Sequence, residues 1–253
     1  MKFNNSNYFN LFLYFSFITS LFVGIFLRIY NLGYDNLWFD EIVTFWVSDP
    51  SISLYESFQR NSSTEATPFF YNFIVSVINK IFSYNPLNQR YVSSFFGILS
   101  VLAFPFLLRL FSKNNSSLFA TILISLNVYL IMYSTEGRTY SLLFFISILT
   151  IFAFIKILHK IKEQKQFKKY AFLYLSLQIL SLTIHPFSLI ILFSIIFFVI
   201  GRLIFLRKKN LFLNFIIIFF FFFTIIYLIL FYKLALIGLA DWVKHPDLKF
   251  FTN

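Results

Sequence analysis

The 253-residue sequence contains no cysteine, which excludes disulfide scaffolds, Cys-based zinc sites and thiol chemistry. Charge is also scarce: charged residues make up 12% of the chain, against about 25% in ordinary soluble domains. So few charges could not cover the core of a water-soluble fold of this size. We find no P-loop, no GxGxxG element and no repeated pair of broken apolar segments, so soluble nucleotide chemistry and secondary transport have no support in the sequence.

Apolar side chains are abundant instead. Hydrophobic residues form 59% of the chain and aromatic residues 23%, with 41 phenylalanines. The 21 basic residues exceed the 10 acidic ones, but they fall in short clusters between apolar stretches rather than in a patch of the kind that binds nucleic acid. This pattern predicts an all-α, multi-pass integral membrane protein that contacts membrane lipids and has no nucleic-acid partner.

Seven apolar runs are candidates for membrane-spanning helices, which need about 20 predominantly apolar residues. They cover residues 8–27, 91–108, 117–134, 139–155, 170–184, 186–206 and 211–232. The sequence therefore predicts a polytopic bundle of about seven transmembrane helices forming one domain over residues 1–253.

An eighth run, residues 68–82, is short and carries Lys80. If it does not cross, the N-terminus is cytoplasmic, and the inner face receives 13 of the 21 basic residues while nine of the ten acids lie outside. If it does cross, residues 31–67 become cytoplasmic. The positive-inside rule favours the first alternative. We therefore expect residues 31–90 to form an extracytoplasmic loop.

The choice between these topologies decides which polar segments can meet. With seven spans, the loop 31–90, the turn 134–138 and the break at residues 185–186 share the outer face. With eight spans, the bilayer separates the first of these segments from the other two. The seven-span topology thus allows a single extracytoplasmic site.

Five ionisable residues stand out in these segments: Asp40 and Glu41 after Trp-Phe, Glu136 and Arg138 between two predicted spans, and His185 at a helix break. Each has an ordinary structural explanation as a solvated acidic loop, an interfacial ion pair and a hydrogen-bonded interfacial histidine. Ionisable groups at the membrane boundary are also candidates for function. Composition alone leaves both explanations open.

The order of the motifs adds information that no single motif carries. Along the chain we find LWFDE, TPFFY, RYVSSFFG, YSTEGRTY and TIHP. Over about residues 20–190 this order resembles the polytopic glycosyltransferases of the GT-C fold, in particular the bacterial RgtA/B/C/D-like family, which is related to protein O-mannosyltransferases and to the lipid A aminoarabinose transferase.

The resemblance implies an inverting transferase in the bacterial cytoplasmic membrane with its active site on the extracytoplasmic face. It also implies that the catalytic loop 31–90 lies over the membrane as juxtamembrane helices. The donor would be a sugar on a polyprenyl phosphate, and the acceptor a hydroxyl of a lipid, a polysaccharide or a protein. The catalytic carboxylate of the family falls on Asp40, with Glu41 beside it, and the second acidic position falls on Glu136. A carboxylate that takes the acceptor proton typically gains about 10²- to 10⁴-fold in rate.

The resemblance also suggests how the substrate is bound. Cations would stabilise the leaving phosphate, with Arg138 and Arg90 as the main candidates. The other predicted substrate-binding residues are Pro68, Tyr71, Tyr140 and His185. A divalent metal is possible but not indicated: Asp40, Glu136 and His185 could hold magnesium or manganese through oxygen, and histidine would also allow zinc.

Two departures from the family pattern leave alternatives open. Thr67 precedes Pro68 where the family usually has two prolines, and family members usually continue through several more spans. We therefore expect a shortened member that ends in an outer tail, residues 233–253. The alternatives are a non-catalytic membrane protein, a subunit that binds a lipid-linked glycan, or a transporter of a polyprenyl-linked substrate.

Overall fold

The computed structural model describes residues 5–65, 67–111 and 114–206, and over these residues the chain is helical, with no strand. Apolar runs with helical length explain most of the elements. The helices are α1 (Asn5–Ile29), α2 (Phe39–Val47), α3 (Leu54–Thr64), α4 (Phe70–Ile81), α5 (Leu87–Leu108), α6 (Asn114–Ser125), α7 (Val128–Thr135), α8 (Tyr140–Lys162), α9 (Lys168–Leu182) and α10 (Ser188–Leu206).

Three helices are long and apolar enough to cross a membrane: α1 over Tyr8–Ile29, α5 and α8. A fourth span results if α6 and α7, which bend by 50° at their junction, are taken together. The chain is therefore a helical membrane protein, but the described residues support three or four spans rather than seven. The predicted span 170–184 corresponds to α9, which has only 15 residues. The predicted span 211–232 and the predicted tail lie outside the described residues.

The contested run 68–82 forms α4, an amphipathic helix of 12 residues. At about 1.5 Å per residue such a helix is about 18 Å long. The hydrocarbon layer is about 30 Å thick. Helix α4 is thus too short to cross by itself, in agreement with the prediction that this run does not span.

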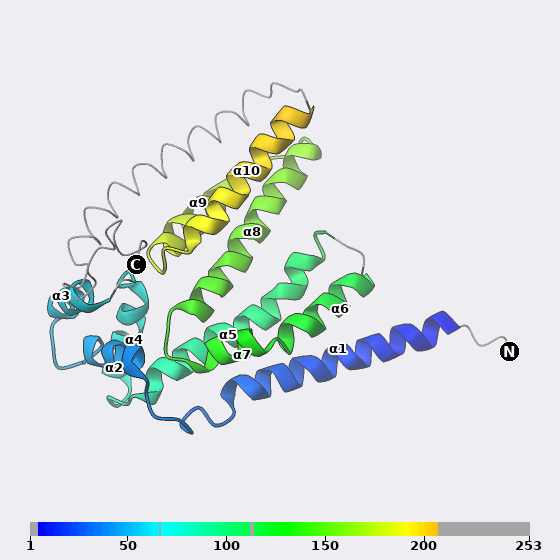
Figure 1. The fold of residues 1–253 in the computed structure, drawn as a ribbon. Coiled ribbons are helices and arrows are strands. Elements are labelled where there is room, and N and C mark those ends of the chain that lie inside the picture. Colours follow the sequence, from blue (N-terminus) through cyan, green and yellow to red (C-terminus); the bar gives the residue numbers. More distant parts are fainter. Residues whose placement is uncertain (1–4, 66, 112–113, 207–253) are drawn as a thin grey trace, which may run out of the picture.

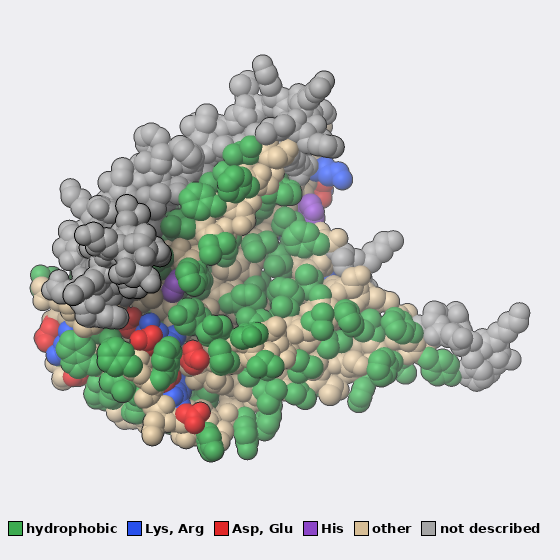
Figure 2. All heavy atoms as spheres, viewed as in Figure 1, with side chains coloured by type: hydrophobic (Ala, Val, Ile, Leu, Met, Phe, Trp, Pro, Cys, Tyr) green, Lys and Arg blue, Asp and Glu red, His purple; other side chains and the backbone are tan. Residues whose placement is uncertain are grey.

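The helices form two groups joined through α5 and α8, as Figure 1 shows. Helices α1, α5, α6 and α7 pack together, and α8, α9 and α10 form the second group. The short helices α2, α3 and α4 gather at one end, beside the ends of α5 and α8 (Figure 1). In Figure 2 most acidic and basic side chains in view lie at this same end, while apolar side chains cover the surface of the long helices.

The exposed apolar surface is what a lipid environment requires. On α1, Phe12, Phe15 and Phe22 are among the most exposed side chains of the described chain. The buried apolar cluster, in contrast, runs from Tyr71 on α4 through Leu142 on α8 to Tyr174 on α9. Aromatic and aliphatic side chains therefore pack in the protein core on some helix faces and are available for contact with lipid tails on others.

The break between α6 and α7 results from a capping side chain. The Asn127 side chain accepts a hydrogen bond from the backbone N–H of Leu130 (3.0 Å) and so starts a new helix. The break frees the Ser125 carbonyl, which accepts from the Arg28 guanidinium of α1 (2.9 Å). Gly24 lies at the same point, and a Cβ on it would be 2.7 Å from the Ser125 carbonyl oxygen.

Replacing Gly24 with alanine should therefore destabilise the fold. The added methyl group meets backbone rather than a side chain that can move away, so α1 must shift from the break at a cost of about 1–3 kcal/mol. Thermal unfolding of the detergent-solubilised chain measures the loss. Gly201→Ala is the matched control, because no described residue lies within 4 Å of a Cβ there. Equal unfolding midpoints for the two variants would contradict the prediction.

Candidate active site

Polar side chains hold the short helices of the loop 31–90 in place. The hydroxyl of Ser53 caps α3 by accepting from the Glu56 N–H (3.1 Å). A chain of amide contacts then ties the three helices together: Asn72 donates to the Asn61 side chain (2.6 Å), and Asn79 donates to the Ser48 carbonyl (3.0 Å). These bonds satisfy buried amides and give the loop a fixed shape.

Glu41 and Arg90 form a buried, two-point ion pair. Arg90 Nε lies 2.8 Å from Glu41 Oε1, and Nη2 lies 2.6 Å from Oε2. The backbone N–H of Gly137 donates a third hydrogen bond to the Glu41 carboxylate (2.6 Å). Since Glu41 is fully buried, this carboxylate is committed to holding the loop, α5 and the turn before α8 together.

Arg90 has no N–H left for a ligand. Besides Glu41, its guanidinium donates to three carbonyls of the segment after α1, those of Leu32 (2.7 Å), Asp35 (2.9 Å) and Asn36 (3.2 Å). All five guanidinium protons are thus engaged. The structure places this predicted phosphate-binding residue at the site as the anchor of the segment that leads to α2.

Arg138 links the turn before α8 to two parts of the loop. It forms a two-point ion pair with Glu65 at 2.7 and 3.1 Å, and it donates to the Asp40 carbonyl (3.0 Å) and to the Thr44 hydroxyl (3.1 Å). The Asp40 carboxylate lies 3.7 Å from Nη2. Arg138 Nε is buried and has no hydrogen-bond partner among the described residues.

Glu65 is the site residue that the sequence reasoning missed. Its buried carboxylate is the main partner of Arg138. A signal was available, because Glu65 stands just before the Thr67-Pro68 element that the resemblance aligned. An acid next to an aligned motif is a reasonable partner for an arginine in another motif.

Asp40 and Glu136 are two carboxylates near Arg138 that accept no hydrogen bond from a described residue. The Asp40 side chain is 41% exposed and accepts no hydrogen bond from a described residue. The Glu136 side chain likewise has neither a hydrogen bond nor an ion pair within the described chain, and it is half-buried. Burial, followed by the charge of Glu41, raises the pKa of Glu136 above its usual range. The site therefore presents one solvent-reachable carboxylate and one that binds a proton more readily.

The other predicted substrate-binding residues lie around this cluster. Tyr71 is buried, and its hydroxyl is shared with the Gln89 carbonyl (2.8 Å) and Ser93 (2.7 Å), so it packs α4 on α5. Pro68 is half-buried just before α4. The ring of Tyr140 lies between those of Tyr133 (4.9 Å) and His185 (5.5 Å). The loop 31–90 thus contacts the turn 134–138, and His185 contacts Tyr140 at the start of α8.

His185 is neutral in this environment. Its Nδ1 accepts a hydrogen bond from the Phe187 N–H (3.0 Å), and the side chain is buried. Burial, assisted by the charge of Arg138, lowers the pKa of His185 to about 4. At neutral pH the imidazole therefore contributes no charge.

This pKa predicts a contribution of His185 to acid sensitivity. Above the ordinary value of 6.5 the histidine is neutral in both the folded and the unfolded chain, so it has no effect. Below 6.5 the unfolded chain takes up the proton first, and the folded chain loses stability until the pH reaches about 4. We expect His185→Asn, which keeps an acceptor for Phe187, to reduce the drop in unfolding midpoint between about pH 7.5 and about pH 5. An unchanged drop would contradict this.

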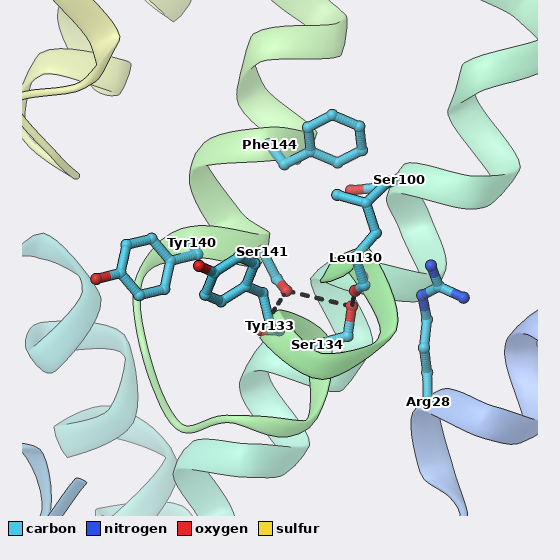
Figure 3. Close-up of a pocket in the computed structure, with 9 residues that line it drawn as sticks. Arg28, Ser100, Leu130, Tyr133, Ser134, Tyr140, Ser141 and Phe144 are labelled. Atoms are coloured by element: carbon cyan, nitrogen blue, oxygen red, sulfur yellow. Dashed lines mark hydrogen bonds between the residues drawn. The ribbon is translucent and has the colours of Figure 1, made fainter. Parts of the chain in front are cut away.

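A cavity of about 40 Å³ lies between α1, α5, α7 and α8 (Figure 3). It is close in sequence to the acid cluster, by which we mean Asp40, Glu41, Glu65 and Glu136. The cavity is lined by Arg28, Gly97, Ser100, Leu130, Tyr133, Ser134, Tyr140, Ser141 and Phe144. Sequence reasoning did not select Arg28 or the serines. Arginine at the end of an apolar run looks like an interfacial anchor, and serines in apolar helices carry little signal.

Metal binding finds no preformed site in the described chain. Within it, no three His, Asp or Glu side chains come together closely enough to hold an ion. Of the three candidates, Asp40 and Glu136 face the Arg138 region, whereas His185 packs among aromatic rings. Those two carboxylates are the residues that could contribute oxygen ligands.

Comparison with known proteins adds no assignment. No protein-family model matches the chain, and no curated protein matches it. The function must therefore be argued from the residues and their geometry.

Proposed function

We propose that this protein is an inverting glycosyltransferase with a GT-C-like bundle of about seven spans, which transfers a sugar from a polyprenyl phosphate to a hydroxyl acceptor at the extracytoplasmic membrane face. The observation that carries the proposal is the state of Asp40. It is partly exposed and free of hydrogen bonds from the described residues, and it lies 3.7 Å from Arg138, which also pairs with Glu65 from another part of the loop.

The chemistry assigns one role to each charged group. The acceptor oxygen attacks the anomeric carbon, and the bond from that carbon to the phosphate oxygen breaks on the opposite face, so the configuration inverts. The acceptor proton passes to Asp40, and the electron pair leaves with the polyprenyl phosphate. No strong acid is required, because a phosphate is already a stable anion near neutral pH.

Asp40 suits the base better than its neighbour Glu41 does. A general base needs a lone pair directed at the acceptor, and the Glu41 carboxylate spends its lone pairs on Arg90 and Gly137. Glu41 is instead a positioning residue. Glu136, with its raised pKa, could hold a proton and donate a hydrogen bond to a sugar hydroxyl.

Arg138 is the cation of the cluster with donor capacity to spare. Its Nε has no partner within the described residues, whereas every N–H of Arg90 is used. Cations aimed at developing negative charge are often the strongest single contribution to lowering the barrier of a transfer reaction. We therefore assign Arg138, rather than Arg90, to the charge that develops during transfer.

A reconstituted transfer assay tests the proposal. The full-length chain in liposomes is supplied with polyprenyl-phosphate-linked sugars and candidate acceptors, and free polyprenyl phosphate and glycosylated product are measured together. Formation of both products supports the transferase. Movement of intact donor across the bilayer without product would indicate a transporter, and binding without either outcome would indicate a non-catalytic glycan-binding subunit.

A further inference from the structure

The three buried arginines of the described chain are not equivalent. Arg90 and Arg138 each have a buried carboxylate partner, Glu41 and Glu65. Arg28 is only 1% exposed, yet it has no carboxylate partner among the residues that the structure describes. A buried charge without a counter-charge costs several kcal/mol. The position of Arg28 therefore calls for an anion.

The hydrogen bonds of Arg28 leave part of its guanidinium unused. Nη1 donates to the carbonyls of Gly24 (2.7 Å) and Ser125 (2.9 Å). Nε is buried and has no partner in the described part of the chain. Carbonyls satisfy two protons but do not neutralise the charge, so the guanidinium still has donors for an anionic ligand.

Arg28 is one of the residues that line the cavity. Figure 3 shows Arg28 reaching from α1 towards Ser100 of α5 and Ser134 of α7. Gly97 allows α7 to approach α5 closely: a Cβ there would collide with the Ser134 side chain and would lie 3.4 Å from Arg28 Cδ. The arginine and the serines thus meet across a glycine rather than across a packed side chain.

The cavity has the size of a phosphoryl group, and its largely apolar wall includes Arg28 and three serines. One water-sized position needs about 10–15 Å³, so a cavity of about 40 Å³ has room for about three oxygen atoms. The hydroxyls of Ser100, Ser134 and Ser141 now donate to carbonyls of nearby backbone. The hydroxyls of Ser100 and Ser134 can rotate and donate to an anion instead, because the Phe96 and Leu130 carbonyls lie within helices and keep their backbone N–H partners.

The cavity also adjoins the proposed reaction site. The turn that places Glu136 and Arg138 in the acid cluster is bracketed by Ser134 and Ser141, which line the cavity. Tyr133 is 37% exposed and forms a wall that reaches the protein surface. A group held by Arg28 would thus lie on the side of the cluster that faces the long helices.

We propose that the Arg28 cavity binds a phosphate ester, through the Arg28 guanidinium and the surrounding serine hydroxyls. Where that ester belongs to a polyprenyl phosphate, this inference rests on the proposed function and places the lipid phosphate of the donor or product. Free phosphate shares the chemistry, and the test separates the two sources.

Equilibrium binding of radiolabelled farnesyl phosphate, a short soluble prenyl phosphate, to the full-length chain in detergent tests the proposal. We expect binding that farnesol, which lacks the phosphate, does not compete. Arg28→Gln should weaken it about 10- to 100-fold, the effect of losing a charged hydrogen-bond donor. If inorganic phosphate competes with farnesyl phosphate, the site recognises the phosphate group alone. If inorganic phosphate does not compete, binding also requires the prenyl chain. Either result supports a phosphate site.

Two serine variants keep the test decisive if Arg28→Gln does not fold. Ser100→Val fills the cavity with a methyl group and leaves the charge in place, so it should also weaken binding. Ser147→Val is the matched control, since Ser147 is a buried serine bonded to the backbone of its own helix that does not line the cavity. Binding that is unchanged in Ser100→Val, or equal for farnesol and farnesyl phosphate, would overturn the proposal. This binding assay measures no sugar transfer, so its result is independent of the Asp40 assay. If the wild type transfers sugar and Arg28→Gln still binds farnesyl phosphate equally well, the proposed function stands and the Arg28 phosphate site is rejected.

Discussion

Asp40→Asn should lower sugar transfer by about 10²- to 10⁴-fold, because it removes the base that accepts the acceptor proton. Asparagine has nearly the same shape and keeps the backbone carbonyl that accepts from Arg138. The fold should therefore survive the change. The rate is measured under single-turnover conditions with saturating donor, so that slow product release does not hide the effect.

Glu56→Gln is the matched control for Asp40→Asn. Glu56 lies in the same loop and pairs with Arg60 at the surface (2.9 Å), away from the acid cluster. It loses one carboxylate charge in the same way, and its transfer rate should stay within about two-fold of the wild type. Equal activity of Asp40→Asn and the wild type would remove Asp40 as the base. Equal losses in the two variants would point to the charge of the whole loop.

Glu41→Ala should have the largest effect on stability. The substitution leaves the buried Arg90 guanidinium with an unpaired charge and leaves the Gly137 N–H without its acceptor. Breaking a buried pair by removing one partner typically costs about 3–5 kcal/mol. We expect little folded protein, or a strongly lowered unfolding midpoint for the detergent-solubilised chain.

Glu56→Ala serves as the comparison here, because its partner Arg60 is exposed enough to be hydrated after the change. An exposed ion pair of this kind is typically worth less than about 1 kcal/mol. If Glu41→Ala unfolds at the same temperature as Glu56→Ala, the Glu41–Arg90 pair does not anchor the loop. Loss of activity with full stability would instead make Glu41 part of the chemistry.

The long apolar helices could be predicted from the sequence, but their number could not. Uninterrupted apolar runs correctly located α1, α5 and α8, because hydropathy reports directly on lipid contact. The run 117–134 looks equally continuous, yet Asn127 caps a second helix inside it. A single polar residue barely changes the average hydropathy of the run, so hydropathy could not predict the bend between α6 and α7.

The start of α5 shows a related difficulty. The prediction began this span at residue 91, after the polar residues Asn88, Gln89 and Arg90, but the helix begins at Leu87. All three side chains are buried, and those of Asn88 and Arg90 bond to Asn79 and Glu41 of the loop. These tertiary hydrogen bonds offset the cost of burying polar side chains at the start of the helix, and local composition does not reveal them.

The site followed the same pattern. In the structure the predicted residue Asp40 lies 3.7 Å from Arg138, but motif order did not distinguish free groups from hydrogen-bonded ones. Only hydrogen-bond geometry shows that Glu41 is saturated, and only burial shows that Arg28 lacks a counter-charge within the described chain. Which member of a charged cluster is available depends on three-dimensional partners.

The contact between Glu41 and the Gly137 N–H joins residues 96 positions apart, and this separation has a consequence for biosynthesis. At about 5–20 residues per second, a ribosome needs about 5–20 s to make the intervening chain. During that interval the nascent loop has already left the ribosome, but its last backbone donor has not been synthesised. The nascent chain thus carries an incomplete acidic pocket until the turn before α8 has been synthesised.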